Sequence, residues 1–207
     1  GLLLFLGISA AEEAIEISSE NLSDVFNGVL LVATVSVVSF LALNFVGEKL
    51  IKRAGASKLA GPVAIALMIA IGIGLHNFGE GLAIGAAIVL GEAALGAFLI
   101  VGFALHNTTE GFAIAAPMAR TKLMIGRLAA MGMIAGVPAI FGAWVGGFVY
   151  SPLAAVIFLA IGVGAIFQVI VLIIRWIQNE EGKLSNSSVL AGIAIGMIIM
   201  YITSILV

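Results

Sequence analysis

The sequence predicts an all-α protein, a polytopic bundle of transmembrane helices with seven spans visible in the chain. Composition is the first reason: of 207 residues, 62% are hydrophobic and only 10% are charged, and the mean hydropathy is +1.27. A soluble domain is about 45–50% apolar and about 25% charged, so a soluble fold could not bury this much apolar surface. The second reason is that the apolar residues form runs, most of them close to the ~20 residues that cross a bilayer.

Short polar, basic or turn-forming segments separate the predicted spans. In chain order the spans cover about residues 1–16, 26–46, 59–90, 95–118, 128–150, 153–175 and 189–207. A turn over 91–94 follows the third span, and Ser151-Pro152 breaks the helix after the fifth. The first run starts at Gly1 with no basic region before it, which is not a signal-peptide pattern. We expect it to be the remainder of a longer span, and an eighth span to be missing at the N-terminus.

Charged side chains distinguish the two ends of the predicted bundle. All nine Lys and Arg residues fall in or beside the connections after the second, fourth and sixth spans. The other connections carry only acidic residues, namely Glu20, Asp24 and Glu92. The positive-inside rule puts the basic side in the cytoplasm, so we expect a plasma-membrane protein whose C-terminus lies outside.

Composition also excludes several classes of partner and site. A net charge of -2 and 8% aromatic residues leave no surface for nucleic acid. The chain has no cysteine, which rules out both disulfides and thiolate metal sites. The expected surroundings are therefore the lipid bilayer and small ions.

Two copies of one motif carry polar residues into the apolar interior. The copies are His76-Asn77-Phe78-Gly79-Glu80 and His106-Asn107-Thr108-Thr109-Glu110. They contain the only two histidines of the chain. Residues three and four apart share a helix face, so each helix presents a His, an Asn and a Glu on one side.

The spacing between the copies predicts which side chains meet. A tight turn joins the two helices, which must then be antiparallel neighbours. Positions 76 and 110 have their midpoint at 93, as do 80 and 106, and 93 falls in the turn. We therefore expect His76 level with Glu110, and Glu80 level with His106. At about 1.5 Å per residue, both pairs lie roughly 20–25 Å from the turn, well inside the bilayer.

Two imidazoles and two carboxylates in one small intramembrane volume indicate a metal site. A carboxylate in mid-bilayer costs at least about 2.5 kcal/mol on insertion scales. No Lys or Arg occurs at a matching depth in any predicted span. A divalent cation would supply the missing charge, and imidazole with carboxylate suits Zn²⁺, Fe²⁺, Mn²⁺ or Co²⁺. The alternative is that neutral side chains only hydrogen-bond the helices to each other.

The pattern H-N-x-x-E-G in two consecutive helices resembles the ZIP (Zrt/Irt-like) divalent metal transporters, in particular the branch with HNxPEG in both helices. The resemblance covers the whole chain, whose seven spans look like the second to eighth of the family's eight. It implies that 1–207 is a single transmembrane metal-transport domain, N-terminally incomplete, which moves divalent metal toward the cytoplasm. It also implies a two-metal centre and a possible homodimer. The implied ligands are His76, Asn77, Glu80, His106, Asn107 and Glu110.

The motif region departs from the family pattern in two ways. Gly79 and Thr109 stand where the family usually has proline, which kinks a helix and frees a carbonyl. Some members also place a carboxylate from a later helix at the second metal, whereas the fifth and sixth spans have none in their interiors. Gln168, inside the sixth span, is either a neutral oxygen ligand for that metal or an interhelical hydrogen-bonding group.

Two other function classes remain open at this point. One is an intramembrane metal enzyme, although the zinc-protease helix signature is H-E-x-x-H and the order here is H-N-x-x-E. No further acid or base lies nearby for catalysis, so we expect a transporter and not an enzyme. The other class is a proton-translocating or purely structural bundle. Metal flux into sealed vesicles separates transport from both.

Overall fold

The computed structural model describes residues 1–22, 27–54, 60–119, 125–149, 151–181 and 186–205 as a helical bundle. The described residues contain seven α-helices, one short 3-10 helix and no strand. The elements are α1 Leu2–Asn21, α2 Gly28–Ala54, α3 Ala60–Val89, α4 Ala93–Ala115, η1 Ala116–Met118, α5 Ile125–Phe148, α6 Pro152–Glu181 and α7 Ser187–Ile205. The predicted all-α class is confirmed.

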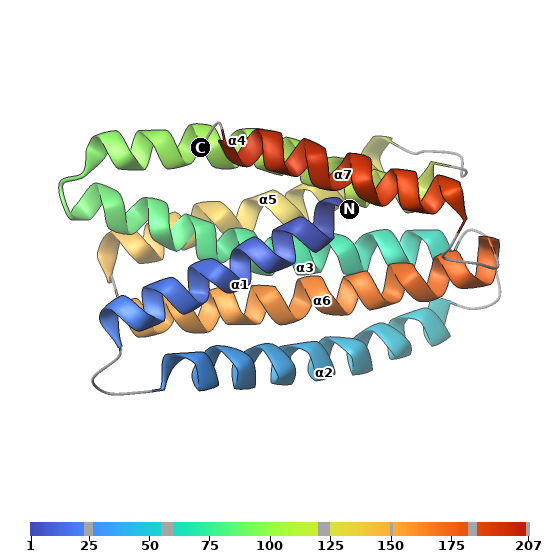
Figure 1. The fold of residues 1–207 in the computed structure, drawn as a ribbon, viewed down its shortest axis with the longest axis horizontal. Coiled ribbons are helices and arrows are strands. Elements are labelled where there is room, and N and C mark those ends of the chain that lie inside the picture. Colours follow the sequence, from blue (N-terminus) through green and yellow to red (C-terminus); the bar gives the residue numbers. More distant parts are fainter. Residues whose placement is uncertain (23–26, 55–59, 120–124, 150, 182–185, 206–207) are drawn as a thin grey trace.

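Successive helices run in opposite directions along one bundle (Figure 1). Within the described residues, the six helices α2 to α7 are long and apolar enough to cross a membrane. α1 is not among these six, because its 20 residues include four glutamates, and it begins partway along the bundle. The chain is therefore a membrane protein built as a polytopic helix bundle.

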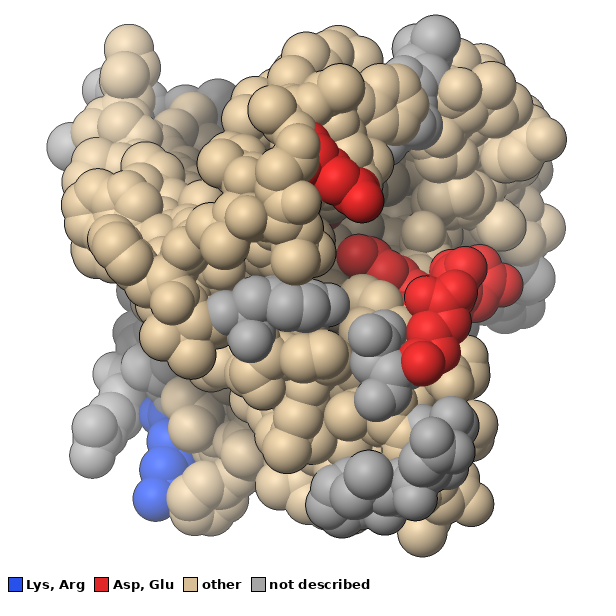
Figure 2. All heavy atoms as spheres, turned by 90° about the vertical axis from the view of Figure 1, so that its left-hand side faces the viewer, with Lys and Arg blue, Asp and Glu red and all other residues tan. Residues whose placement is uncertain are grey.

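Acidic side chains gather at the bundle end where α1 ends and α3 meets α4. Figure 2 shows acidic side chains around a hollow in this end face. Lys49, Arg127 and Arg175 lie toward the opposite end, on the last turns of α2, the first turn of α5 and the last turns of α6. Among the described residues, Lys and Arg thus lie away from the acidic end face, although the other end also carries an acidic residue, Glu48, beside Lys49.

The helices on the basic side run further than the apolar pattern predicts. We expected the second span to end near residue 46, yet α2 continues to Ala54. Residues 48–53 contain no Gly or Pro, and Lys, Arg, Leu and Glu all favour helix. Lys49 also places its Nζ 4.1 Å from the centroid of the Phe45 ring, one turn back along α2. The basic residues therefore prolong the helix past its apolar part.

A short turn makes α3 and α4 antiparallel neighbours. Gly91 adopts a φ of 83°, a left-handed conformation that glycine accepts without steric cost. The N–H of Glu92 donates to Ala87 O at 2.9 Å, and the N–H of Gly91 donates to Ile88 O at 3.2 Å. This pair of bonds is a Schellman motif, which ends a helix and reverses the chain. The predicted turn is confirmed, and it sets the register of the two motif helices.

α3 and α6 form the centre of the bundle. In their membrane windows 61% and 56% of residues are buried, against 11–22% in the other four spans. α3 packs most extensively against α5 and next against α6. Large apolar side chains on the outer faces of α2, α4, α5 and α7 are exposed, as expected for helices that face lipid.

A glycine seam, made by Gly81 of α3 and Gly142 of α5, lets these two helices approach closely. A Cβ at Gly81 would overlap the carbonyl of Ala139, and a Cβ at Gly142 would overlap the carbonyl of Phe78. Without a hydrophobic driving force in lipid, helix association depends on such close backbone packing. Because Phe78 and Gly81 flank Glu80, the seam also holds the first motif in place.

Gly81→Ala should destabilise the protein, because the added methyl group meets the Ala139 carbonyl. Overpacking of this kind costs about 1–3 kcal/mol, so the midpoint of thermal unfolding in detergent should fall. Gly126→Ala is the matched control on α5, since nothing lies within 4 Å of a Cβ there. Equal midpoints for the two variants would contradict the seam.

Candidate metal centre

α3 and α4 bring four ionisable side chains into one cluster in the middle of the bundle. His76 Nε2 lies 3.2 Å from Glu80 Oε1, and His106 Nε2 lies 3.5 Å from the same oxygen. His106 Nε2 is also 3.6 Å from Glu110 Oε1. The two imidazole rings are nearly parallel, with an interplanar angle of 13° and centroids 6.3 Å apart. We call these four residues the His/Glu cluster.

The register of the two helices brings Glu80 to His106, as predicted. The two remaining short contacts join i and i+4 on the same helix, His76 to Glu80 and His106 to Glu110. Such pairs share a helix face and meet without help from the register. The level pairing of His76 with Glu110 stays a prediction.

The cluster is buried, and the helices around it carry no Lys or Arg. The side chains of His76, Glu80 and Glu110 are 2–3% exposed, and that of His106 is 14% exposed. The sequences of α1, α3, α4 and α7 contain no Lys or Arg. Burying a charge without a partner is strongly disfavoured. A bound cation is therefore the partner that fits this donor set.

Three of the side chains have the spacing of metal ligands. One nitrogen each of His76 and His106 and one oxygen of Glu80 lie within 4.8 Å of one another. A tetrahedral Zn²⁺ site has ligands about 2.0–2.2 Å from the metal, which separates neighbouring ligands by about 3.3–3.6 Å. The contacts of 3.2 and 3.5 Å from Glu80 Oε1 to the two imidazoles are close to that separation.

Two cavities reach the cluster from different sides. The α1-side cavity, of about 180 Å³, lies between α1, α3, α4 and α7, and its lining includes Glu13, His76, Glu80 and His106. The α5-side cavity, of about 270 Å³, lies between α3, α4 and α5, and its lining includes Asn77, Asn107 and Glu110. The six motif residues therefore divide into two donor sets, one for each cavity.

Several polar atoms of the α5-side donor set have no hydrogen-bond partner among the described residues. They are Asn77 Oδ1, Asn107 Oδ1 and both carboxylate oxygens of Glu110. Asn77 Nδ2 donates to the carbonyl of Ala135 on α5 at 3.1 Å, so its amide is held in one orientation. Buried acceptors without donors are rare in native structures. A cation in the α5-side cavity would satisfy them.

The two positions that carry proline in the ZIP pattern make helix contacts here. A Cβ at Gly79 would lie 2.8 Å from Leu159 Cδ2, so Gly79 lets α6 approach α3. Thr109 Oγ1 donates to the carbonyl of His106 at 2.6 Å and lies 3.0 Å from Met200 Sδ of α7. Both positions thus serve packing against α6 and α7.

A proline does occur on the helix that faces the first motif. Pro138 lies inside α5 and has no N–H to offer the carbonyl of Ile134. That carbonyl contacts Gly74 of α3, and the next one, of Ala135, accepts the bond from Asn77. Pro138 could not be connected with the site from the sequence, because only the packing of α5 on α3 reveals the link.

Gln168 lies apart from the cluster. Its Nε2 is 3.3 Å from the position of a Cβ on Gly47 of α2, next to Met68 of α3. The side chain is buried, and its Oε1 has no partner among the described residues. Gln168 lines neither cavity. The structure therefore does not bring it to the motif residues, and its role as a ligand stays a prediction.

Glu13 lies beside the cluster, whereas the sequence favoured a solvated helix end for it over a funnel for cations. It lines the α1-side cavity together with two histidines and Glu80. Its sequence neighbours include Glu12 and Glu16, a pattern typical of a solvated helix end. Spacing gives one signal that could have found it, because Ser9 and Glu13 are four residues apart and share a helix face with apolar residues.

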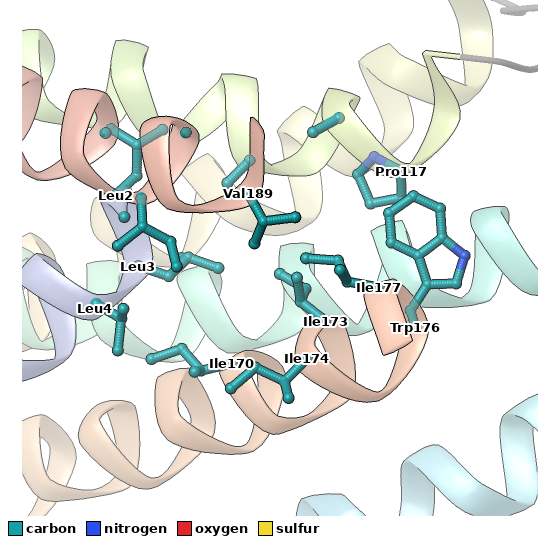
Figure 3. Close-up of a pocket in the computed structure, with 16 residues that line it drawn as sticks. Leu2, Leu3, Leu4, Pro117, Ile170, Ile173, Ile174, Trp176, Ile177 and Val189 are labelled. Carbon is teal, nitrogen blue, oxygen red and sulfur yellow. The ribbon is translucent and has the colours of Figure 1, made fainter. Parts of the chain in front are cut away.

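A further cavity, of about 250 Å³, lies between α1, α4, α6 and α7 (Figure 3). Its walls are aliphatic except near Pro117 and Trp176, and no titratable side chain lines it. A divalent cation needs oxygen or nitrogen ligands. This cavity is therefore not an ion site.

Glu80→Gln should abolish stabilisation by Zn²⁺ yet leave the metal-free protein at least as stable as the native chain. The amide removes repulsion with Glu110 in the empty site, but it also removes the oxygen shared by both imidazoles. A ligand at about 100 times its Kd adds about 2.7 kcal/mol, which a thermal melt with and without Zn²⁺ detects. Glu92→Gln, exposed at the α3–α4 turn, is the control. An undiminished Zn²⁺ shift in Glu80→Gln would exclude Glu80 as a ligand.

Comparison with known proteins identifies no relative of this chain. No family model, no curated protein and no solved structure matches the chain. The function of the chain must therefore be inferred from the residues of the centre.

Proposed function

We propose that this protein is a membrane transporter that moves divalent metal cations toward the cytoplasm through the His/Glu cluster. The observation that carries the proposal is the burial of two glutamates against two histidines inside a bundle of membrane-spanning helices. Ionisable residues at membrane depth mark ion pathways, because their cost must be offset by function. Zn²⁺ fits the donor set best, and Fe²⁺, Mn²⁺ and Co²⁺ share the preference for imidazole and carboxylate.

Transport accounts for the cavities better than a structural metal would. A structural zinc site is closed and leaves no free space beside the metal. Here two cavities border the cluster, from the α1 side and from the α5 side. An ion can therefore approach the cluster from one side and leave it from another.

Two donor sets support a two-metal centre. His76, Glu80 and His106 supply nitrogen and oxygen to the first position. Asn77, Asn107 and Glu110 supply oxygen to the second, where the free acceptors lie. The resemblance of the motifs to the ZIP transporters supports the same arrangement.

The inward direction of transport is what the resemblance to the ZIP transporters implies, and the distribution of charge gives the orientation of the bundle. Under the positive-inside rule, the end with Lys49, Arg127 and Arg175 faces the cytoplasm and the acidic end faces outward. Carboxylates around the hollow in the acidic end face raise the local concentration of cations (Figure 2). Cations therefore collect at the end that faces outward.

Purified protein in liposomes should carry Zn²⁺ to a trapped fluorescent zinc indicator. Glu80→Gln and Glu110→Gln should each reduce the initial rate to that of empty liposomes, because each removes a buried carboxylate of the path. Glu92→Gln should keep the native rate, since its side chain is exposed at the turn. Tight Zn²⁺ binding without any flux would favour an intramembrane metal enzyme or a structural metal site.

Cysteine labelling tests the orientation cleanly, because the natural chain contains no cysteine. In intact cells, an impermeant maleimide should label Glu20→Cys and Glu92→Cys but not Lys49→Cys or Arg127→Cys. Permeabilised cells should allow labelling of all four, which controls for accessibility. The reverse pattern would mean that the proposed direction of transport is wrong.

A further inference from the structure

We propose that Glu13 of α1 is a metal ligand, so that a third helix completes the centre formed by α3 and α4. The inference rests on the proposed metal site and adds to it a residue that belongs to neither motif. The ligand class is a divalent transition-metal ion that accepts oxygen and nitrogen donors.

The position of Glu13 differs from that of the other carboxylates of α1. Glu12, Glu16 and Glu20 are exposed, whereas Glu13 is partly buried and lines the α1-side cavity. Leu6 and Ala10, on the neighbouring turns of the same face, are each 1% exposed. Glu13 thus lies on the buried face of α1, where this face borders the cavity, and not on the solvated face.

The wall that faces Glu13 offers an incomplete donor set. His76 is 2% exposed, and its Nδ1 has no hydrogen-bond partner among the described residues. Glu80 Oε2 is likewise buried without a partner among the described residues. Unpartnered donor atoms from α3 therefore border the same cavity as the carboxylate from α1.

Coordination chemistry favours a fourth ligand at this position. His76, Glu80 and His106 provide three donor atoms, whereas Zn²⁺ binds four ligands in tetrahedral sites. The other polar side chains that line the α1-side cavity are Ser9, Glu13 and Ser204. Ser204 Oγ already donates to Tyr201 O at 2.9 Å, and serine is a poor ligand for these metals. Glu13 is the remaining carboxylate.

Charge balance favours the same residue. Two divalent ions bring four positive charges, and Glu80 with Glu110 offsets only two of them. α5 has no carboxylate, and the first carboxylate of α6 is Glu180, near its end. Glu13 is therefore the third negative charge available beside the cluster, and it comes from α1 and not from a later helix.

Zn²⁺ and Co²⁺ titrations of the purified full chain test the inference. Glu13→Gln should weaken the affinity for Zn²⁺ by about tenfold or more, at least the loss expected when a supporting group of a metal site is removed. Glu12→Gln is the matched control, with the same change of charge one residue away and exposed. Its affinity should stay within about twofold of native, because salt screens exposed charges. Equal losses of Zn²⁺ affinity in the two variants would mean that Glu13 acts only by long-range attraction of the cation, and would overturn the proposal.

A second variant reports contact with the ion directly. The chain has no cysteine, so Glu13→Cys introduces a single thiol. If position 13 reaches the ion, Co²⁺ binding should produce a thiolate-to-cobalt charge-transfer band in the near ultraviolet. Glu12→Cys should produce none. Bound Co²⁺ without that band in Glu13→Cys, together with native affinity in Glu13→Gln, would overturn the proposal.

The same titration distinguishes failure of the ligand role of Glu13 from failure of the proposed transport function. Native protein that binds and transports Zn²⁺, with Glu13 variants that behave like native, would overturn the ligand role and leave the transporter proposal intact. Native protein that binds neither Zn²⁺ nor Co²⁺ would overturn both.

Discussion

Two carboxylates buried in the same small volume are the constraint on which the centre depends. Glu80 and Glu110 stand on helices without Lys or Arg, and both residues are almost fully buried. In such surroundings their mutual repulsion is weakly screened, so the cluster without a bound ion works against the packing of α3 on α4. An ion between the helices reverses the sign of this interaction. The same residues then both bind the metal and join the helices.

The site could be predicted where it depends on local geometry. The midpoint of the two motifs fell in the turn around Gly91, and helical rise then fixed the meeting of Glu80 with His106. Both steps use only distances along the chain. The ends of α2 and α6 were predicted less well, because helix propensity continues past the apolar residues that mark the span.

For three residues, the position relative to the site could not be predicted from the sequence. Glu13 lines the cavity beside the cluster only because of how α1, which packs mainly on α6, is placed in the bundle, and the acidic neighbours of Glu13 give no sign of this in the sequence. Gln168 looked like a candidate ligand by polarity and depth, yet it faces α2 at Gly47. Pro138 touches the site through the carbonyls of its own helix. The location of each of these residues depends on which faces of distant helices pack together. The spacing of apolar residues along a single helix does not specify that packing.

The glycine seam holds α3 more firmly in the bundle than α4. α3 is fixed against α5 by backbone contact, whereas α4 packs far less extensively on α5. The contact of His76 with Glu80 lies within α3 and survives any tilt of α4, but the contact of His106 with Glu80 crosses between the helices. The number of side chains that could bind an ion at the cluster therefore depends on the position of α4 relative to α3. In the proposed transporter, a small tilt of that helix would leave an ion with only the two ligands of α3, His76 and Glu80, and would thus be a step toward its release.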